Sequence, residues 1–203
     1  MQNKGLVIAA SVAVLFACVL CGCDPRNDRA GAELARQTAE HSRAHKYEEA
    51  LATAEEAVEV APESHFSWAA LGGALMSLER YEDAADAYQA AIAIEPDDAT
   101  LYDRLADPLL YMDEHEAAEA ALRRAIELEP DAADHHRSLA ASLIELDRLE
   151  EAEEAVRRAL ELDDTAVNRQ VFGRVLASQE RYDEALTQFD IAVEKAPADP
   201  RAH

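Results

Sequence analysis

Basic side chains are scarce in this 203-residue sequence. It has 19 lysines and arginines against 42 aspartates and glutamates, which gives a formal net charge of −23. A surface this acidic repels nucleic-acid phosphates and anionic lipid headgroups. The composition therefore excludes a nucleic-acid-binding protein and a polybasic helix that lies on a membrane surface.

Aromatic residues, glycine and proline are also few. Aromatic side chains make up 5% of the sequence, and there are 6 glycines and 7 prolines. These numbers exclude a collagen-like or low-complexity chain, and the 49% of apolar residues excludes a wholly disordered one. Alanine, leucine, valine and isoleucine must therefore supply most of the core. The length allows one domain or two.

Cysteine is confined to the first 23 residues, which have the anatomy of a secretory signal peptide. Lys4 gives a short positive start, and an uncharged, mostly apolar segment continues to Leu20. If this segment is removed, no thiol is left to form a disulfide, which suits an oxidising compartment. An uncleaved membrane anchor is the alternative, because the apolar run is at the short edge of what spans a bilayer.

The segment ends in a Leu-Cys-Gly-Cys sequence at residues 20–23. This sequence resembles the bacterial lipobox, and the resemblance implies cleavage before Cys23 and attachment of diacylglyceryl to its sulfur. A similar match that ends at Cys18 is weaker, because the bulky Phe16 lies two residues before it. In enterobacteria-like lipoproteins, an aspartate in the place of Asp24 is associated with the inner membrane.

The lipobox resemblance divides the start of the chain into a signal peptide over 1–22 and a lipidated cysteine with a short tether over 23–30. Seven extended residues, 24–30, span at most about 25 Å. The mature protein is therefore expected in the cell envelope, anchored by lipid close to a bacterial membrane and facing the periplasm.

A four-residue pattern that ends in alanine recurs along the rest of the sequence. Its alanines are at positions 50, 84, 118, 152 and 185, so the spacings are 34, 34, 34 and 33 residues. A second alanine follows seven residues later in each copy, and a proline then follows in four of the five copies. Asp164 replaces this proline in the fourth copy. A fixed period of this length indicates a repeat architecture.

Each copy contains two stretches of about 14 residues with apolar positions at i, i+3, i+4 and i+7, which predicts two amphipathic helices. Acidic pairs such as Glu48-Glu49 open the second helix, where they favour the positive end of its dipole. One repeat cannot bury its apolar face alone, so stacked neighbours must share a core. Pro108 lies inside a predicted first helix and is expected to kink it.

The pattern resembles the tetratricopeptide repeat, most fully at Trp68, Leu71, Gly72 and Leu75 of the second copy. The resemblance implies an all-α fold, a right-handed superhelical solenoid of about five helix pairs. The expected repeats are 31–64, 65–98, 99–132, 133–165 and 166–199, followed by a tail at 200–203.

The two ends of the array differ from its middle. Gln37, Thr38 and His41 put polar side chains at packing positions of the first repeat, which suits an N-terminal capping helix. At the other end Lys195 partly caps the stack, whereas Ile191 and Val193 are expected to stay exposed. This apolar patch is either ordinary fraying at a chain end or a docking or self-association face.

No motif for nucleotide binding, zinc hydrolysis or thiol redox chemistry occurs. His41 and His45 lie four residues apart on one predicted helix, but no third metal ligand is evident. The sequence therefore predicts no enzyme, cofactor, metal or small-molecule substrate. The enzyme alternative is a hydrolase that acts through its acidic clusters, and it requires a carboxylate with a raised pKa.

Ligands of tetratricopeptide proteins usually lie against the first helix of each repeat. Ala35 and Ala39 occupy positions where the family's clamp for a C-terminal carboxylate needs lysine and asparagine, so a chaperone-tail receptor is not expected. The resemblance implies a partner-binding groove at twelve positions: Phe66, Ala69, Gly73, Met76, Thr100, Asp103, Asp107, Leu110, Tyr111, Arg137, Ile144 and Arg174.

An apolar strip with an acidic rim would suit an amphipathic helix or an extended segment with basic flanks. The alternative is that Phe66 and Leu110 pack between neighbouring helices, since packing residues follow the same period. The predicted function is a membrane-anchored adaptor that binds a protein or peptide in the bacterial envelope. It resembles small repeat lipoproteins of pilus, secretion or outer-membrane assembly. A self-associating scaffold is the alternative.

Overall fold

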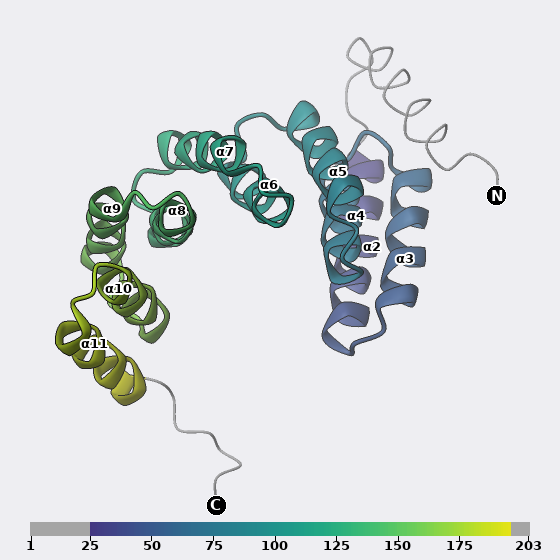
Figure 1. Ribbon diagram of the computed structural model, residues 1–203. Helices are drawn as coiled ribbons and strands as arrows, with labels where there is room; N and C mark the ends of the chain where they lie inside the picture. Colours follow the sequence, from purple (N-terminus) through teal and green to yellow (C-terminus); the bar gives the residue numbers. More distant parts are fainter. Residues whose placement is uncertain (1–24, 196–203) are drawn as a thin grey trace, which may run out of the picture. The chain divides into compact units, whose positions relative to one another are not determined.

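The computed structural model describes residues 25–195, which form ten α-helices and no strand (Figure 1). The all-α fold predicted from the sequence is confirmed. Predictions for residues 1–24 and 196–203 lie outside the described residues. The helices are α2 Pro25–Arg43, α3 Tyr47–Val60, α4 His65–Ser77, α5 Tyr81–Ile94, α6 Ala99–Tyr111, α7 His115–Leu128, α8 Ala133–Glu145, α9 Leu149–Leu162, α10 Ala166–Ser178 and α11 Tyr182–Lys195.

The described part of the chain divides into two compact units, with the boundary between Met112 and Asp113. In the first unit, consecutive helices from α2 to α6 pack on each other, and α2 also packs on α4. In the second unit, the same holds from α7 to α11, and α8 packs on α10. The division falls between α6 and α7, the two helices of the repeat expected at 99–132.

The first helix begins earlier than the sequence predicted. α2 starts at Pro25, so residues 25–30, which the sequence assigned to the tether, are helical. Proline is well suited to the first position of a helix, and Asp28 places an acid in the first turn. An ideal Cβ built at Gly31 would lie 2.7 Å from the side-chain oxygens of Ser64 and Ser67. This close approach explains why α2 packs directly on α4.

The helices from α3 to α11 alternate between 14 and 13 residues. The first helix of each pair ends in a turn that contains one non-glycine residue with a φ between 56° and 62°. These helices are α2, α4, α6, α8 and α10. The amides of Lys46, Arg80, Arg148 and Arg181 then donate to carbonyls five residues earlier. This is the Schellman motif, in which glycine is the usual left-handed residue. The left-handed residues here are His45, Glu79, Asp113, Asp147 and Glu180.

Trp68 is the largest fully buried side chain of the first unit. It is 2% exposed, and its indole Nε1 donates to the carbonyl of Pro62 at 2.8 Å. Around it pack Leu71 and Leu75 of its own helix and buried alanines of α3 and α5. The alanines let neighbouring helices approach closely, which is how a sequence with few aromatic residues fills its core.

The second unit repeats this arrangement with aliphatic side chains. Leu122, Leu143, Val156 and Leu176 are all at most 1% exposed. Gly173 faces Phe189, and an ideal Cβ at Gly173 would lie 2.5 Å from the phenyl ring. The missing side chain at position 173 therefore lets α11 pack on α10.

The proline inside α6 does not end the helix. α6 continues to Tyr111 through the buried Pro108, whose carbonyl accepts a hydrogen bond from the amide of Met112.

Within residues 25–195, no helix has the length and apolar character needed to cross a membrane.

Asp164, which replaces the repeat's proline, ties three segments of the second unit together. Its carboxylate accepts from Arg169 at 2.7 Å and pairs with Lys195 Nζ at 3.2 Å. The hydrogen bond from Arg169 and the charge of Lys195 lower the pKa of Asp164 to about 2. Lys195 also donates to the Asp164 carbonyl, so these contacts hold the end of α11 to the turn before α10.

Candidate functional site

A groove of about 590 Å³ runs over α2, α4 and α6 of the first unit. It is formed entirely by the first helices of successive pairs and by the residues at their starts. The residues that line it are Ala35, Thr38, Ala39, Ser42, Arg43, His65, Phe66, Ala69, Ala70, Gly73, Ala74, Ser77, Asp98, Thr100, Leu101 and Arg104.

Four residues that the sequence assigned to a groove line it together: Phe66, Ala69, Gly73 and Thr100. Met76 does not line it, because its side chain packs against the hydrophobic core around Trp68. The sequence placed Met76 in the groove, and the lining does not include it.

Phe66 is the large apolar side chain that the groove exposes to solvent. It is 42% exposed, and its ring lies 3.9 Å from that of His65. The positions that follow it on α4 in the groove lining are all small: Ala69, Ala70, Gly73, Ala74 and Ser77. The alternative in which Phe66 is buried between helices does not hold. Such a surface can accept an apolar side chain of a bound segment.

The charges beside this apolar surface differ from the acidic rim that the sequence predicted. Arg43 and Arg104 line the groove, whereas Asp103 and Asp107 do not. The lining carboxylate, Asp98, accepts from the Thr100 amide at 2.9 Å and so caps α6. The groove therefore presents two guanidinium groups within a strongly acidic chain.

The remaining predicted residues of the first unit lie elsewhere on α6. Tyr111 is exposed, and its ring stacks on that of Tyr81 at 4.5 Å with an interplanar angle of 5°. Leu110 and Asp103 are half-buried, while Asp107 is exposed. Both aspartates have polar partners within the described structure.

The predicted residues of the second unit are engaged in internal contacts. Arg137 pairs with Asp134 on the same helix, and Arg174 pairs with Glu145 at 3.6 Å. Ile144 is half-buried on α8. A cavity of about 660 Å³ instead lies between α7 and α9, over apolar side chains of α8. Its lining includes Arg123, Glu151, Arg157, Arg158 and Glu161, whose charges pair within the unit.

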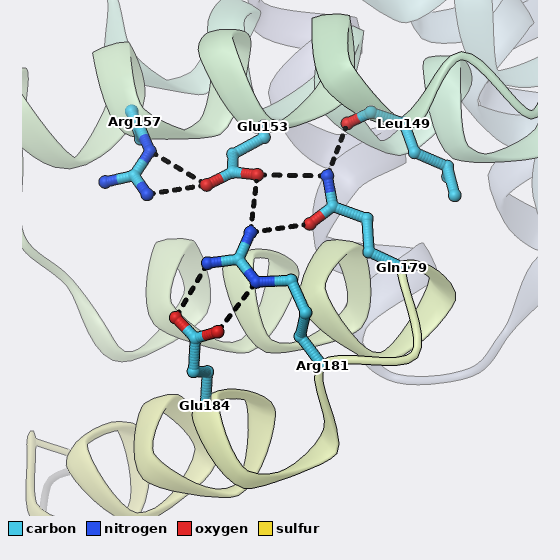
Figure 2. Close-up of polar contacts among 6 residues, drawn as sticks. All are labelled: Leu149, Glu153, Arg157, Gln179, Arg181 and Glu184. Carbon is cyan, nitrogen blue, oxygen red and sulfur yellow. Dashed lines mark hydrogen bonds and ion pairs between the residues drawn. The ribbon is translucent and has the colours of Figure 1, made fainter.

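The second unit also holds a repeated set of ion pairs, which we call the ionic ladder. In its lower rung, Glu153 accepts from Arg157 at 3.1 Å, Gln179 at 3.0 Å and Arg181 at 2.8 Å (Figure 2). Arg181 in turn donates twice to Glu184, each time at 2.7 Å. In its upper rung, one repeat earlier, the corresponding residues are Glu119, Arg123, Arg148 and Glu151.

The ionic ladder lowers carboxylate pKa values. Burial alone would raise the pKa of Glu153, but hydrogen bonds from Arg157 and Gln179 and the charge of Arg181 leave it below its ordinary value. The pKa of Glu119 is lowered in the same way by Arg123 and Arg148. Every described carboxylate with a resolved shift has a lowered pKa. A hydrolytic general acid needs the opposite shift, so these carboxylates do not support the hydrolase alternative.

The histidine pair does not share a helix. His41 is in the last turn of α2, but His45 lies beyond its end in a left-handed turn, where its Nδ1 contacts the hydroxyl of Tyr47 at 2.8 Å. Among residues 25–195, no cluster of three or more His, Cys, Asp or Glu side chains is arranged to hold a metal.

The sequence analysis missed the part of the groove that α2 provides. Ala35, Ala39, Ser42 and Arg43 occupy the same repeat positions as Ala69, Gly73, Met76 and Ser77 of α4. The signal was present, because the ligand positions used for the later repeats extend to the first one. Thr38, one of the polar residues at packing positions of the first repeat, is buried, and its hydroxyl donates to the Leu34 carbonyl at 3.0 Å.

Comparison with known proteins agrees with this architecture. A family model described as tetratricopeptide repeat matches residues 40–99, 104–167 and 171–203. No curated protein sequence matches the chain.

Several solved structures share the fold at low sequence identity. A thermophilic tetratricopeptide repeat protein of Thermus thermophilus is 24% identical with a TM-score of 0.74, over 83% of this chain and 93% of that one. Pseudomonas aeruginosa pilF is 18% identical with a TM-score of 0.74, over 86% and 80%. YrrB, described as having an unusual peptide-binding site, is 22% identical with a TM-score of 0.60, over 86% and 89%.

Proposed function

Because this chain belongs to the tetratricopeptide repeat family, we propose that it is a protein-binding adaptor whose first unit holds a segment of a partner protein. The observation that carries the proposal is the groove over α2, α4 and α6, in which the exposed Phe66 lies among small residues. Repeat proteins of this kind generally serve as interaction scaffolds, and the adaptor has no catalytic step of its own.

The composition of the groove indicates the chemistry of the segment. An apolar side chain of the partner packs against Phe66, and carboxylates of the partner face Arg43 and Arg104. Guanidinium groups form strong, oriented hydrogen bonds with carboxylates. Small residues at Ala69 and Gly73 allow an extended backbone to approach the helix surface. The proposed ligand is an extended peptide segment with an apolar anchor and at least one acidic residue.

We also propose that the adaptor works in the bacterial envelope, anchored by lipid on Cys23 to a membrane and facing the periplasm. The support for this is the signal-peptide anatomy and the lipobox resemblance of residues 1–23. The partner would then be an envelope protein, such as a component of a pilus, secretion or outer-membrane assembly. Asp24 favours the inner membrane.

Substitution of Phe66 by aspartate is expected to reduce partner binding by at least about tenfold, since an anchor residue of a groove usually contributes about 2 kcal/mol or more. The measurement is photo-crosslinking in living cells from a reactive group placed at Ser77 in the groove, followed by identification of the linked segment. Val60→Asp is the matched control, because Val60 is 48% exposed in the same unit but does not line the groove.

The crosslinked segment must come from another protein. The crosslinking yield must fall in Phe66→Asp and stay unchanged in Val60→Asp. Equal yields in both variants would place binding outside the groove. A crosslinked segment that is basic and carries no acidic residue would contradict the proposed contacts with Arg43 and Arg104.

Substitution of Cys23 by serine is expected to abolish incorporation of labelled fatty acid, because serine lacks the sulfur that accepts diacylglyceryl. Cys18→Ser and Cys21→Ser are the matched controls and should keep the label. The label is measured on the full chain after extraction in detergent. Retained labelling in Cys23→Ser, or its loss in Cys18→Ser alone, would refute Cys23 as the lipid attachment site.

A further inference from the structure

α11 carries an apolar stripe that no described residue covers. Tyr182, Leu186 and Val193 are 62%, 61% and 74% exposed, and their spacing of four and seven puts them on one helix face. We call these three residues the α11 stripe. The adjacent face is the packed one, since Ala185 and Ala192 are buried there. The stripe therefore borders the core of the second unit and faces solvent.

The equivalent positions of the earlier second helices are covered. Leu51, which the repeat spacing aligns with Leu186, is 8% exposed within the hydrophobic cluster that Trp68 and Leu71 of α4 complete. Tyr81, which aligns with Tyr182, is covered by the stacked ring of Tyr111 from α6. In both cases the cover is the next helix along the chain, and it contributes aromatic or aliphatic side chains.

The ionic ladder shows that α11 is not suited to the kind of neighbour found inside the second unit. There, Glu119 and Glu153 occupy the position of Leu186, and Arg148 and Arg181 of the following repeat reach over them. Their side chains are only 13% and 18% exposed. On α11 the carboxylate is replaced by leucine, so a covering helix must contribute an apolar side chain at this point rather than an arginine.

Beside the α11 stripe, the sign of the charge is opposite to that at the equivalent position of α7. Arg123 on α7 reaches forward to Glu151 of the next pair at 3.3 Å. The repeat spacing aligns Arg123 with Asp190 on α11. Asp190 lies with Asp183 and Glu194 in an exposed row, and none of the three has an ion pair among the described residues. A partner should therefore supply cations where the internal repeat supplies Glu151.

We infer that the α11 stripe binds an amphipathic helix of another protein, with aromatic or leucine side chains on one face and Lys or Arg along one edge. The apolar face covers Tyr182, Leu186 and Val193, and the basic edge meets the acidic row. A second copy of α11 placed on the same stripe would bring two acidic rows together, which disfavours self-association. The inference is independent of the groove on the first unit.

The test uses a labelled helical peptide of about 18 residues, with leucines on one face and lysines along one edge. Its affinity is measured by fluorescence anisotropy for the full chain in phosphatidylcholine nanodiscs, with empty nanodiscs as blank. Leu186→Asp should weaken binding at least about tenfold, and Asp190→Asn about threefold. Val60→Asp, an equally new aspartate on α3, should leave the affinity unchanged.

The sign of the Leu186→Asp effect excludes non-specific attraction. This variant is more acidic than the parent, so a merely electrostatic complex with a basic peptide would be equally tight or tighter. Leu186 is exposed, so the far-ultraviolet circular dichroism and melting temperature should not change. A peptide with glutamates in place of the lysines should bind at least about tenfold more weakly.

Three results would overturn the inference. The first is equal affinity of the parent and Leu186→Asp for the lysine peptide. The second is binding that occurs only after residues 196–203 are deleted, which would mean that the chain itself covers the stripe. The third is dimerisation in analytical ultracentrifugation that Leu186→Asp abolishes, without peptide binding, which would assign the stripe to a second copy.

Discussion

Replacement of Trp68 by alanine is expected to lower the free energy of unfolding of the first unit by about 3–5 kcal/mol. The indole is 2% exposed and lies at the centre of the cluster built by α3, α4 and α5. Its loss leaves a cavity in this cluster and the Pro62 carbonyl without the indole donor. Since domains are typically stable by about 5–15 kcal/mol, the change removes a large share of that stability.

The measurement is urea unfolding of the full chain, followed by circular dichroism because the substitution removes the only tryptophan. Phe66→Ala is the control: it removes a neighbouring aromatic ring of α4 that is 42% exposed, and its effect should be within about 1 kcal/mol. A loss below about 1 kcal/mol for Trp68→Ala would show that the cluster does not hold the first unit together.

Replacement of Glu153 by alanine is expected to destabilise the second unit by about 1–3 kcal/mol. The carboxylate accepts hydrogen bonds from Arg157 of its own helix and from Gln179 and Arg181 of the turn between α10 and α11 (Figure 2). Its side chain is only 18% exposed, so water compensates incompletely for the lost acceptor. The variant leaves two guanidinium groups close together without the carboxylate between them.

Glu154→Ala is the matched control, because this adjacent glutamate of α9 is exposed and has no ion pair among the described residues. Unfolding is measured in urea at several pH values. The pKa of Glu153 is lower in the folded protein than in the unfolded chain, where it is about 4.3. Glu153 therefore stabilises the fold above a pH of about 4.3, and this contribution is lost as the pH falls from there through the folded pKa. Identical pH profiles for parent and Glu153→Ala would contradict the assigned role.

The helical organisation could be predicted because its signals are local and repeated. The 34-residue period and the spacing of alanine and leucine determine where each helix begins and which face it buries. Phe66, Ala69, Gly73 and Thr100, which the repeat positions single out, line one groove, and partner binding there stays a prediction. Cys23 lies outside the described residues, and its lipidation stays a prediction.

The remaining residues of the groove could not be predicted, because they depend on contacts between repeats, and the position of a residue within its own repeat does not determine these contacts. Met76 and Phe66 both occupy ligand positions of the repeat, but Met76 is partly buried against the core, whereas Phe66 is 42% exposed. Asp98 was not recognised as a helix cap, and Arg43 was overlooked because the first repeat departs from the signature. The charge of the groove therefore depends on which side chains point into it, here Arg43 and Arg104, and not on the net charge of −23.

The left-handed turns have a consequence for the order in which the segments of the chain fold. Five non-glycine residues adopt positive φ, at a local cost of about 1–3 kcal/mol each in other proteins. A first helix with its turn has no partner to offset that cost until the next helix packs on it. Each repeat should therefore become stable only together with its second helix, so chains truncated at Glu79 or Asp147 expose an unsupported helix to chaperones and proteases.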